Sequence, residues 1–125
     1  MQKKILIVED EPNIVIPLEF LMEQNDFDVK VAITGEEAIE TIESFNPDLI
    51  LLDIMLPGMD GYEVCQKVRQ NPKLPHTKII FLSALARDID IAKGMGLLAD
   101  GFITKPFSIS DVVDTVKNLL GSDSY

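Results

Sequence analysis

The side chains of this sequence that could take part in chemistry are mostly carboxylates that come directly after short apolar segments. The acidic triplet at residues 9–11 follows the apolar run 5–8, and Asp53 follows the run 49–52. Close carboxylates repel one another unless a cation lies between them or one of them takes up a proton. If these acids meet in the fold, they form a site for a hard divalent cation, of which Mg²⁺ is typical.

Two further polar side chains stand at equivalent places, because Ser83 and Lys105 each follow another apolar run. A hydroxyl can donate a hydrogen bond to an anionic oxygen, and an ammonium can neutralise it. No thiol or imidazole stands at such a place, since Cys65 lies in a helical pattern and His76 in a Pro-flanked loop. The pattern therefore favours oxygen ligation and argues against zinc.

The elements that must position these groups are five apolar, β-branched runs that alternate with segments of helical periodicity. The runs predict strands at residues 5–8, 29–32, 49–52, 78–82 and 101–104. The segments after them predict five helices. The fourth helix has the weakest pattern, because Gly94 and Gly96 each cost about 1 kcal/mol relative to Ala inside a helix. We expect it to be mobile.

Local signals mark the ends of several helices. Thr34 and Ser108 are suited to cap the second and fifth helices, and Pro12 is suited to the first turn of the first helix. Pro17 falls inside that first helix and is expected to bend it, which bears on how a partner would dock there.

Strict alternation of strands and helices predicts a parallel sheet with helices on both faces. The first, third and fourth runs are apolar throughout, as central strands require, whereas the second alternates and the fifth is short and begins with Gly. We therefore expect an α/β, flavodoxin-like (βα)5 doubly wound sheet with strand order 2-1-3-4-5. Ligands bind such sheets beyond the carboxyl ends of the strands. This topology brings residues 9–11 and Asp53 into one crevice, with Ser83 and Lys105 at the same edge.

The composition limits the classes of function. The chain has 125 residues, of which 46% are hydrophobic and 26% charged, so it is expected to form one soluble domain. Its net charge of −10 disfavours direct binding of nucleic acid or of an anionic membrane. No apolar run is long enough to span a bilayer, no signal peptide is evident, and the single Cys65 cannot build a disulfide framework. We expect a cytoplasmic protein.

With its motifs in place, the sequence resembles the receiver domain of two-component response regulators, the CheY-like superfamily. The resemblance is carried by the segments ILIVEDEP, LILLDIMLPGMDGYEV, IIFLSA and DGFITKPF, and it covers essentially the whole chain. We expect residues 1–121 to form the receiver domain and residues 122–125 to be a tail or the start of a linker.

The resemblance implies that Asp53 accepts a phosphoryl group in a phosphorelay. The donor would be a phosphohistidine of a sensor histidine kinase or histidine phosphotransfer protein, or a small phosphodonor. It implies further that Asp10, Asp53 and the backbone carbonyl of Met55 ligate Mg²⁺ or Mn²⁺, while Glu9 acts mainly through a bound water. Such a domain is a signalling module that catalyses only its own phosphorylation and slow dephosphorylation.

The resemblance also implies a switch. Ser83 and Lys105 would bind phosphoryl oxygens, and Phe102 would turn inward as Ser83 engages. The Lys105–Pro106 peptide bond would be cis. The fourth helix, fifth strand and fifth helix would then present the changed surface to a downstream protein or to a C-terminal effector domain.

Other classes of function fit less well. An aspartyl-phosphate hydrolase of the haloacid-dehalogenase type has a second acid two residues after its nucleophile, where this chain has Met55. A flavin-binding electron carrier needs a hydroxyl- and Gly-rich loop after the first strand, where this chain has EDEP. The remaining alternative is a receiver-like interaction module that is never phosphorylated. Loss of an acid, the hydroxyl or the lysine would mark such a module, and all are present.

Overall fold

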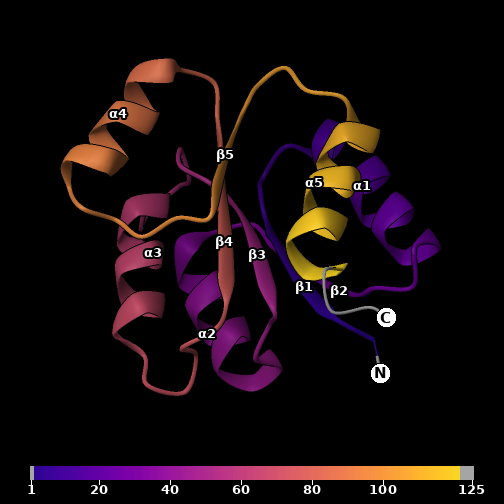
Figure 1. Ribbon diagram of the computed structural model, residues 1–125. Coiled ribbons are helices and arrows are strands. Elements are labelled where there is room, and N and C mark those ends of the chain that lie inside the picture. Colours follow the sequence, from indigo (N-terminus) through magenta and orange to yellow (C-terminus); the bar gives the residue numbers. More distant parts are fainter. Residues whose placement is uncertain (1, 122–125) are drawn as a thin grey trace.

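The computed structural model describes residues 2–121, over which the chain forms five strands and five helices in strict alternation (Figure 1). The tail predicted at residues 122–125 lies outside the described residues. In chain order the elements are β1 (Lys4–Val8), α1 (Pro12–Gln24), β2 (Asp28–Ala32), α2 (Gly35–Phe45), β3 (Leu49–Asp53), α3 (Gly61–Gln70), β4 (Lys78–Ser83), α4 (Ala86–Gly94), β5 (Gly101–Thr104) and α5 (Ile109–Leu120).

All strands are parallel and lie in the order β2-β1-β3-β4-β5, which confirms the predicted flavodoxin-like topology. The three central strands are almost completely buried, because helices cover both of their faces. At the edges, β2 alternates between exposed and covered residues and β5 is only partly covered. The apolar and alternating patterns thus separated central from edge strands correctly.

Two strands, β3 and β4, extend one residue beyond their predicted carboxyl ends, and both extra residues are site candidates. Asp53 is paired with Leu82, and Ser83 is paired with Thr104. Their side chains are therefore attached to strand backbone and not to a loop. Rigid placement of a functional group follows from this arrangement, because strand positions are held by the neighbouring strands on each side.

Two apolar cores lie on opposite faces of the sheet. Helices α2, α3 and α4 cover one face and α1 and α5 cover the other, as Figure 1 shows. Side chains alternate between the two cores along each central strand: in β1, Leu6 and Val8 belong to the first core, and Ile5 and Ile7 to the second. Burial on both faces holds the strand ends, and hence the candidate site, in fixed register.

The predicted helix caps are confirmed. Thr34 accepts a hydrogen bond from the backbone N–H of Glu37, and the Glu37 carboxylate accepts one from Ile33, so the start of α2 is held from both sides. Ser108 accepts from the N–H of Asp111 at the start of α5. Pro12 is the first residue of α1. The helix continues through Pro17 to Gln24, and the bend at Pro17 stays a prediction.

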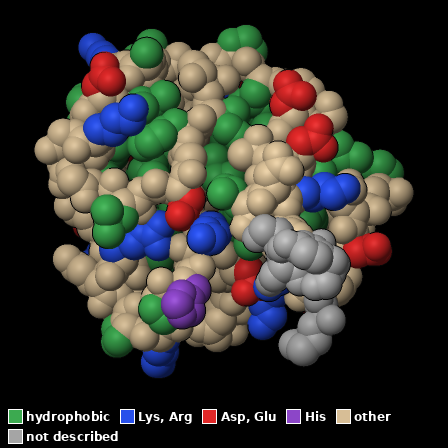
Figure 2. All heavy atoms as spheres, in the orientation of Figure 1, with side chains coloured by type: hydrophobic (Ala, Val, Ile, Leu, Met, Phe, Trp, Pro, Cys, Tyr) green, Lys and Arg blue, Asp and Glu red, His purple; other side chains and the backbone are tan. Residues whose placement is uncertain are grey.

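The fourth helix differs from its prediction in one respect. Helix α4 ends at Gly94, and Gly96 lies beyond that end with a φ of 72°, a conformation that glycine adopts at little cost. Gly96 therefore terminates the segment and does not weaken the helix interior. Over α4, Figure 2 shows apolar side chains exposed among charged ones, and Ile91 and Met95 are about half exposed. No helix within residues 2–121 is long and apolar enough to cross a membrane.

Candidate functional site

The predicted acids come together at the carboxyl ends of β1 and β3. One carboxylate oxygen from each of Glu9, Asp10 and Asp53 lies within 4.8 Å of the other two. Glu9 is fully buried, Asp53 has 4% of its surface exposed, and Asp10 is exposed. The cluster thus has two carboxylates beneath the surface and one at its mouth, an arrangement open to solvent on one side.

Lys105, the residue after β5, reaches across this edge into the acid cluster. Its Nζ lies 2.9 Å from Oε1 of Glu9, 3.3 Å from Oδ2 of Asp53 and 3.2 Å from Oε1 of Glu11. Only 13% of its side chain is exposed. Glu11 was expected in this crevice as the third acid of the triplet, but its contact with Lys105 was not predicted. One ammonium therefore faces several carboxylates and neutralises the cluster incompletely.

The pKa values of these groups reflect burial and incomplete neutralisation. Burial raises the pKa of Glu9 to about 7, opposed by its hydrogen bond with Lys105 and reinforced by the charge of Asp53. Burial also raises the pKa of Asp53, against the lowering effect of Lys105. For Lys105, burial works to lower the pKa, but the charges and hydrogen bonds of the carboxylates, Glu9 first, raise it overall. Further positive charge at this edge is therefore electrostatically favourable.

The donor set fits a hard divalent cation. All three clustered groups are carboxylates, and Asp10 is accessible to water. Oε1 of Glu9 is buried and lies 2.9 Å from the ammonium of Lys105, and as a carboxylate oxygen it can accept from a further partner or bind a cation as well. The side chains that zinc usually binds lie elsewhere: Cys65 is a buried residue of α3, and His76 precedes β4.

The loop after β3 is packed tightly between α2 and α3. The N–H of Met55 donates to Oδ1 of Asp53 at 3.2 Å, which fixes the carboxylate from its own loop. The N–H of Met59 donates to Glu36 of α2 at 3.2 Å, and Gly58 has a φ of 72°. The side chain of Met55 is 68% exposed. The ligand role of its carbonyl stays a prediction.

Gly61, the first residue of α3, lies directly against the candidate acceptor. A Cβ at this position would overlap the carbonyl oxygen of Asp53 and stand 2.8 Å from Cα of Ile54. The N–H of Gly61 donates to the carbonyl of Ile54 at 2.9 Å. Only glycine, which has no Cβ, allows α3 to begin this close to the end of β3. The close contact at Gly61 therefore helps to position the strand that carries Asp53.

Ser83 is completely buried and its hydroxyl is already hydrogen-bonded. Its Oγ lies 2.8 Å from the carbonyl oxygen of Leu85 and 3.2 Å from Oδ2 of Asp88, and it accepts from the N–H of Leu85 at 3.1 Å. Asp88 is itself only 6% exposed, although it belongs to the first turn of α4. The sequence reasoning did not find Asp88.

Phe102 of β5 packs inward, toward the α4 side of the sheet. Its ring stacks on Phe81 with centroids 5.8 Å apart, and Nζ of Lys93 lies 5.5 Å from its centroid. It is one of the partly buried residues packed against the core beneath α4. Nearby, the Lys105–Pro106 peptide is cis, as the resemblance implied.

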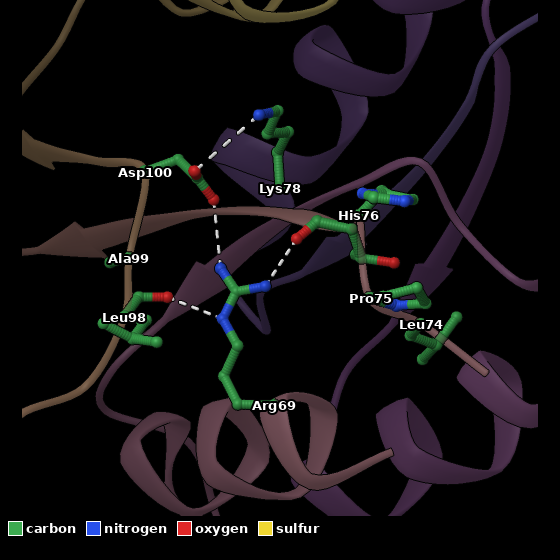
Figure 3. Close-up of a pocket in the computed structure, with 9 residues that line it drawn as sticks. Arg69, Leu74, Pro75, His76, Lys78, Leu98, Ala99 and Asp100 are labelled. Atoms are coloured by element: carbon green, nitrogen blue, oxygen red, sulfur yellow. Dashed lines mark hydrogen bonds and ion pairs between the residues drawn. The ribbon is translucent and has the colours of Figure 1, made fainter. Parts of the chain in front are cut away.

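A hollow of about 470 Å³ lies at the opposite end of the strands, near the amino ends of β4 and β5. It is lined in part by Arg69, His76 and Asp100 (Figure 3). The guanidinium of Arg69 donates to the carbonyls of Leu98 and Thr77 and to the carboxylate of Asp100. The charges of Arg69 and Asp100 in this hollow therefore compensate each other.

Comparison with known proteins agrees with this geometry. Residues 5–117 match the family model described as response regulator receiver domain. The chain is 44% identical over 120 residues to the alkaline phosphatase synthesis transcriptional regulatory protein PhoP of Bacillus subtilis, covering 96% of this chain and 49% of that protein. It thus spans about half the length of this curated relative.

Solved structures share the fold over nearly the whole chain. A CheY-like receiver domain protein of Methanospirillum hungatei superposes with a TM-score of 0.88 at 29% identity, covering 99% of this chain and 98% of that one. The receiver domain of a sensor histidine kinase from Pseudomonas aeruginosa, with a magnesium ion coordinated in its active site cleft, has a TM-score of 0.85 at 26% identity, covering 98% and 100%. The chain belongs to the response regulator receiver domain family of two-component systems.

Proposed function

We propose that this domain is a phosphoacceptor whose acceptor is Asp53, and that its phosphorylation depends on Mg²⁺ or Mn²⁺. The observation that carries the proposal is the position of the Asp53 carboxylate: it is nearly buried, closes the carboxyl end of a central strand, and lies 3.3 Å from the ammonium of Lys105. Oδ1 of Asp53 accepts from the N–H of Met55 and Oδ2 faces Lys105, which together hold the carboxylate in place. Each oxygen has a further lone pair, so the carboxylate can still attack phosphorus.

The transfer is a substitution at phosphorus. An oxygen of Asp53 attacks the phosphorus of a phosphohistidine, the P–N bond breaks, and its electron pair goes to the imidazole nitrogen of the donor. An aspartyl phosphate results. Lys105 is placed to neutralise a phosphoryl oxygen, because its Nζ already faces Asp53. Ser83 supplies a hydrogen-bond donor from the next strand once its hydroxyl turns from its present partners.

Glu9, Asp10 and Asp53 would hold the divalent cation, with the Met55 carbonyl as the predicted further ligand. When bound, the cation supplies positive charge next to the phosphoryl oxygens. Glu9 is the deepest of the acids and Asp10 the most accessible, which supports the view that Glu9 acts through water and Asp10 directly.

The output surface of the proposed switch is formed by α4, β5 and α5. Phosphorylation adds roughly −1.5 to −2 charges at the edge where β4 and β5 end. Ser83 is followed directly by the α4 segment, and Phe102 links β5 to the core beneath α4. A hydroxyl drawn toward Asp53 would therefore pull on the segment that leads into α4. Phe102 is the proposed switch aromatic, and in this structure its ring already packs inward on Phe81.

The expected partners are a sensor histidine kinase or a histidine phosphotransfer protein upstream. Downstream we expect a separate protein or a C-terminal effector domain, since the curated relative is about twice as long as the matched region. Residues 1–121 would form the receiver domain, and residues 122–125 a tail or linker. The net charge of −10 argues against direct nucleic-acid binding by this chain, and the proposed signalling role is in the cytoplasm.

The decisive experiment is intact-mass analysis after incubation with acetyl phosphate. With Mg²⁺ we expect a single phosphoryl adduct that is lost in base, and with EDTA we expect no adduct. Reduction of the adduct with borohydride should convert Asp53 alone to homoserine, which peptide mapping detects.

Asp53→Asn should abolish the adduct, and Asp28→Asn serves as the matched control, because Asp28 is an exposed aspartate at the start of β2. An equal adduct on Asp53→Asn would refute the assignment of the acceptor. No adduct on the wild-type protein, with either acetyl phosphate or a phosphorylated histidine domain as the donor, would favour the alternative of an interaction module that is never phosphorylated.

A further inference from the structure

The start of α4 carries a buried acid that is hydrogen-bonded by the residue proposed to bind the phosphoryl group. Asp88 has 6% of its surface exposed. Over residues 2–121, its carboxylate has one hydrogen-bond donor within reach, the hydroxyl of Ser83 at 3.2 Å, whose single proton is shared with the carbonyl oxygen of Leu85 at 2.8 Å. A carboxylate kept away from water loses much of its solvation, so a single donor is important for keeping it in place.

The hydroxyl of Ser83 has one proton and three candidates for it. At present the acceptors are the carbonyl of Leu85 at 2.8 Å and the carboxylate of Asp88 at 3.2 Å. A phosphoryl oxygen on Asp53 would be the third. Because a hydroxyl donates once, a hydrogen bond from Ser83 to the phosphoryl group withdraws the donor from Asp88.

We propose that Asp88 is the positioning residue that couples the Ser83 hydroxyl to α4, since its buried carboxylate is left without a donor when Ser83 turns to a phosphoryl group. The inference rests on the proposed function for its trigger, but the pairing of Ser83 with Asp88 exists in the unphosphorylated structure. An unpaired buried carboxylate is driven toward water, and the first turn of α4 moves with it.

The rest of the α4 segment is suited to such a movement. The N-cap residue Leu85 makes no side-chain cap hydrogen bond and is 46% exposed. Besides its core contacts, the helix start is tied to α3 by the Tyr62 hydroxyl, which donates to the carbonyl of Asp88 at 2.9 Å. Of the helix's residues, only Asp88 and Ala92 are buried.

The first test needs no phosphorylation and measures amide hydrogen exchange over residues 84–90. Ser83→Ala removes the donor and should speed this exchange roughly tenfold, in line with a lost hydrogen bond to a charged group. In the double variant Ser83→Ala/Asp88→Ala most of that increase should disappear, because no buried charge is left unpaired. The control pair Ser83→Ala/Asp90→Ala should keep it, since Asp90 is an exposed aspartate of the same helix.

A merely structural role for Asp88 predicts the reverse, with the double variant exchanging as fast as Ser83→Ala or faster, and that result would overturn the inference. Should Asp88→Ala fail to fold, Asp88→Asn keeps the shape while removing the charge, and it should still remove a clear part of the increase. A double variant with Asn that shows no decrease would count against the proposal equally.

The second test uses the protein phosphorylated with acetyl phosphate and Mg²⁺. Phosphorylation of the wild type should speed exchange over residues 84–90 several-fold, and Asp88→Ala should reduce this increase to less than about half. An unchanged increase in a variant that is phosphorylated normally would refute the coupling role. Failure of the wild type to take up a phosphoryl group would refute the proposed function instead, and the first test would still decide the role of Asp88.

Discussion

Gly61 offers the sharpest test of how tightly the acceptor strand is held, because the same substitution can be made at a control glycine. Gly61→Ala places a Cβ against the carbonyl of Asp53 and 2.8 Å from Cα of Ile54, both of which are backbone atoms. At Gly94 in α4 nothing lies within 4 Å of the added Cβ. The two changes are chemically identical and differ in their surroundings.

The expected free energies of unfolding follow from these contacts. Overpacking against atoms that cannot turn away costs about 3 kcal/mol, the upper part of the usual range. Gly61 is the first residue of its helix, so alanine there returns only about half of the interior value of about 1 kcal/mol, and Gly61→Ala should lose about 2.5 kcal/mol in all. Gly94→Ala should gain about 0.5 kcal/mol, because it meets no atom and restricts the unfolded chain.

Urea unfolding followed by circular dichroism measures the difference. With a dependence of about 1.5–2 kcal/mol per molar urea, the two midpoints should differ by more than about 1 M, with the wild type between them. The displaced β3–α3 junction should also slow labelling of Asp53 by acetyl phosphate in Gly61→Ala. A Gly61→Ala protein as stable as the wild type would show that α3 can move away freely, and would refute the claim that this contact fixes the acceptor.

Other predictions concern the chemistry and its output. Lys105→Ala should retain Mg²⁺ binding in calorimetry but lose the change in amide exchange on phosphorylation. A variant that loses Mg²⁺ binding but keeps the change in exchange would contradict the role of Lys105 in binding the phosphoryl group. Met55 and Leu85 are exposed apolar side chains that flank the predicted path of the attacking water, so slow dephosphorylation is expected, and Met55→Asn/Leu85→Glu should speed it at least several-fold in a phosphate-release assay. An unchanged rate of decay would count against that reasoning. Beryllofluoride should expose α4 to a protein partner without tight self-association, and a micromolar dimer in sedimentation that forms only with it would contradict this expectation.

The fold could be predicted because its pattern is local and repeated. Five apolar runs and the helical segments between them give the alternation, and the continuous apolar character of β1, β3 and β4 gives the strand order. The acid cluster followed from topology alone, since parallel strands bring their carboxyl ends to one edge. Asp53 and Lys105, which are 52 positions apart, were placed together in this way.

What the sequence did not predict depends on how helices and loops rotate against the sheet. In α4 the spacing of Ile89 and Ala92 predicted an apolar face, and the structure does bury Ala92 and partly cover Ile89, but nothing in the pattern predicted that Asp88 is buried beside them. A helical pattern this short is compatible with several rotations, and only packing selects one of them. The contact of Glu11 with Lys105 likewise depends on where the loop after β1 turns.

The contacts of Arg69 near the amino ends of β4 and β5 make the two ends of the sheet differ in charge balance. There the guanidinium of Arg69 meets acceptors from the segments before β4 and β5, and Asp100 also accepts from the backbone N–H of Ile79. A planar fork suits acceptors in several directions, whereas lysine offers one compact charge, so Arg69→Lys is not a conservative change. The charges at the amino ends of β4 and β5 thus compensate one another, whereas the carboxyl ends of the strands keep a surplus of negative charge around Lys105.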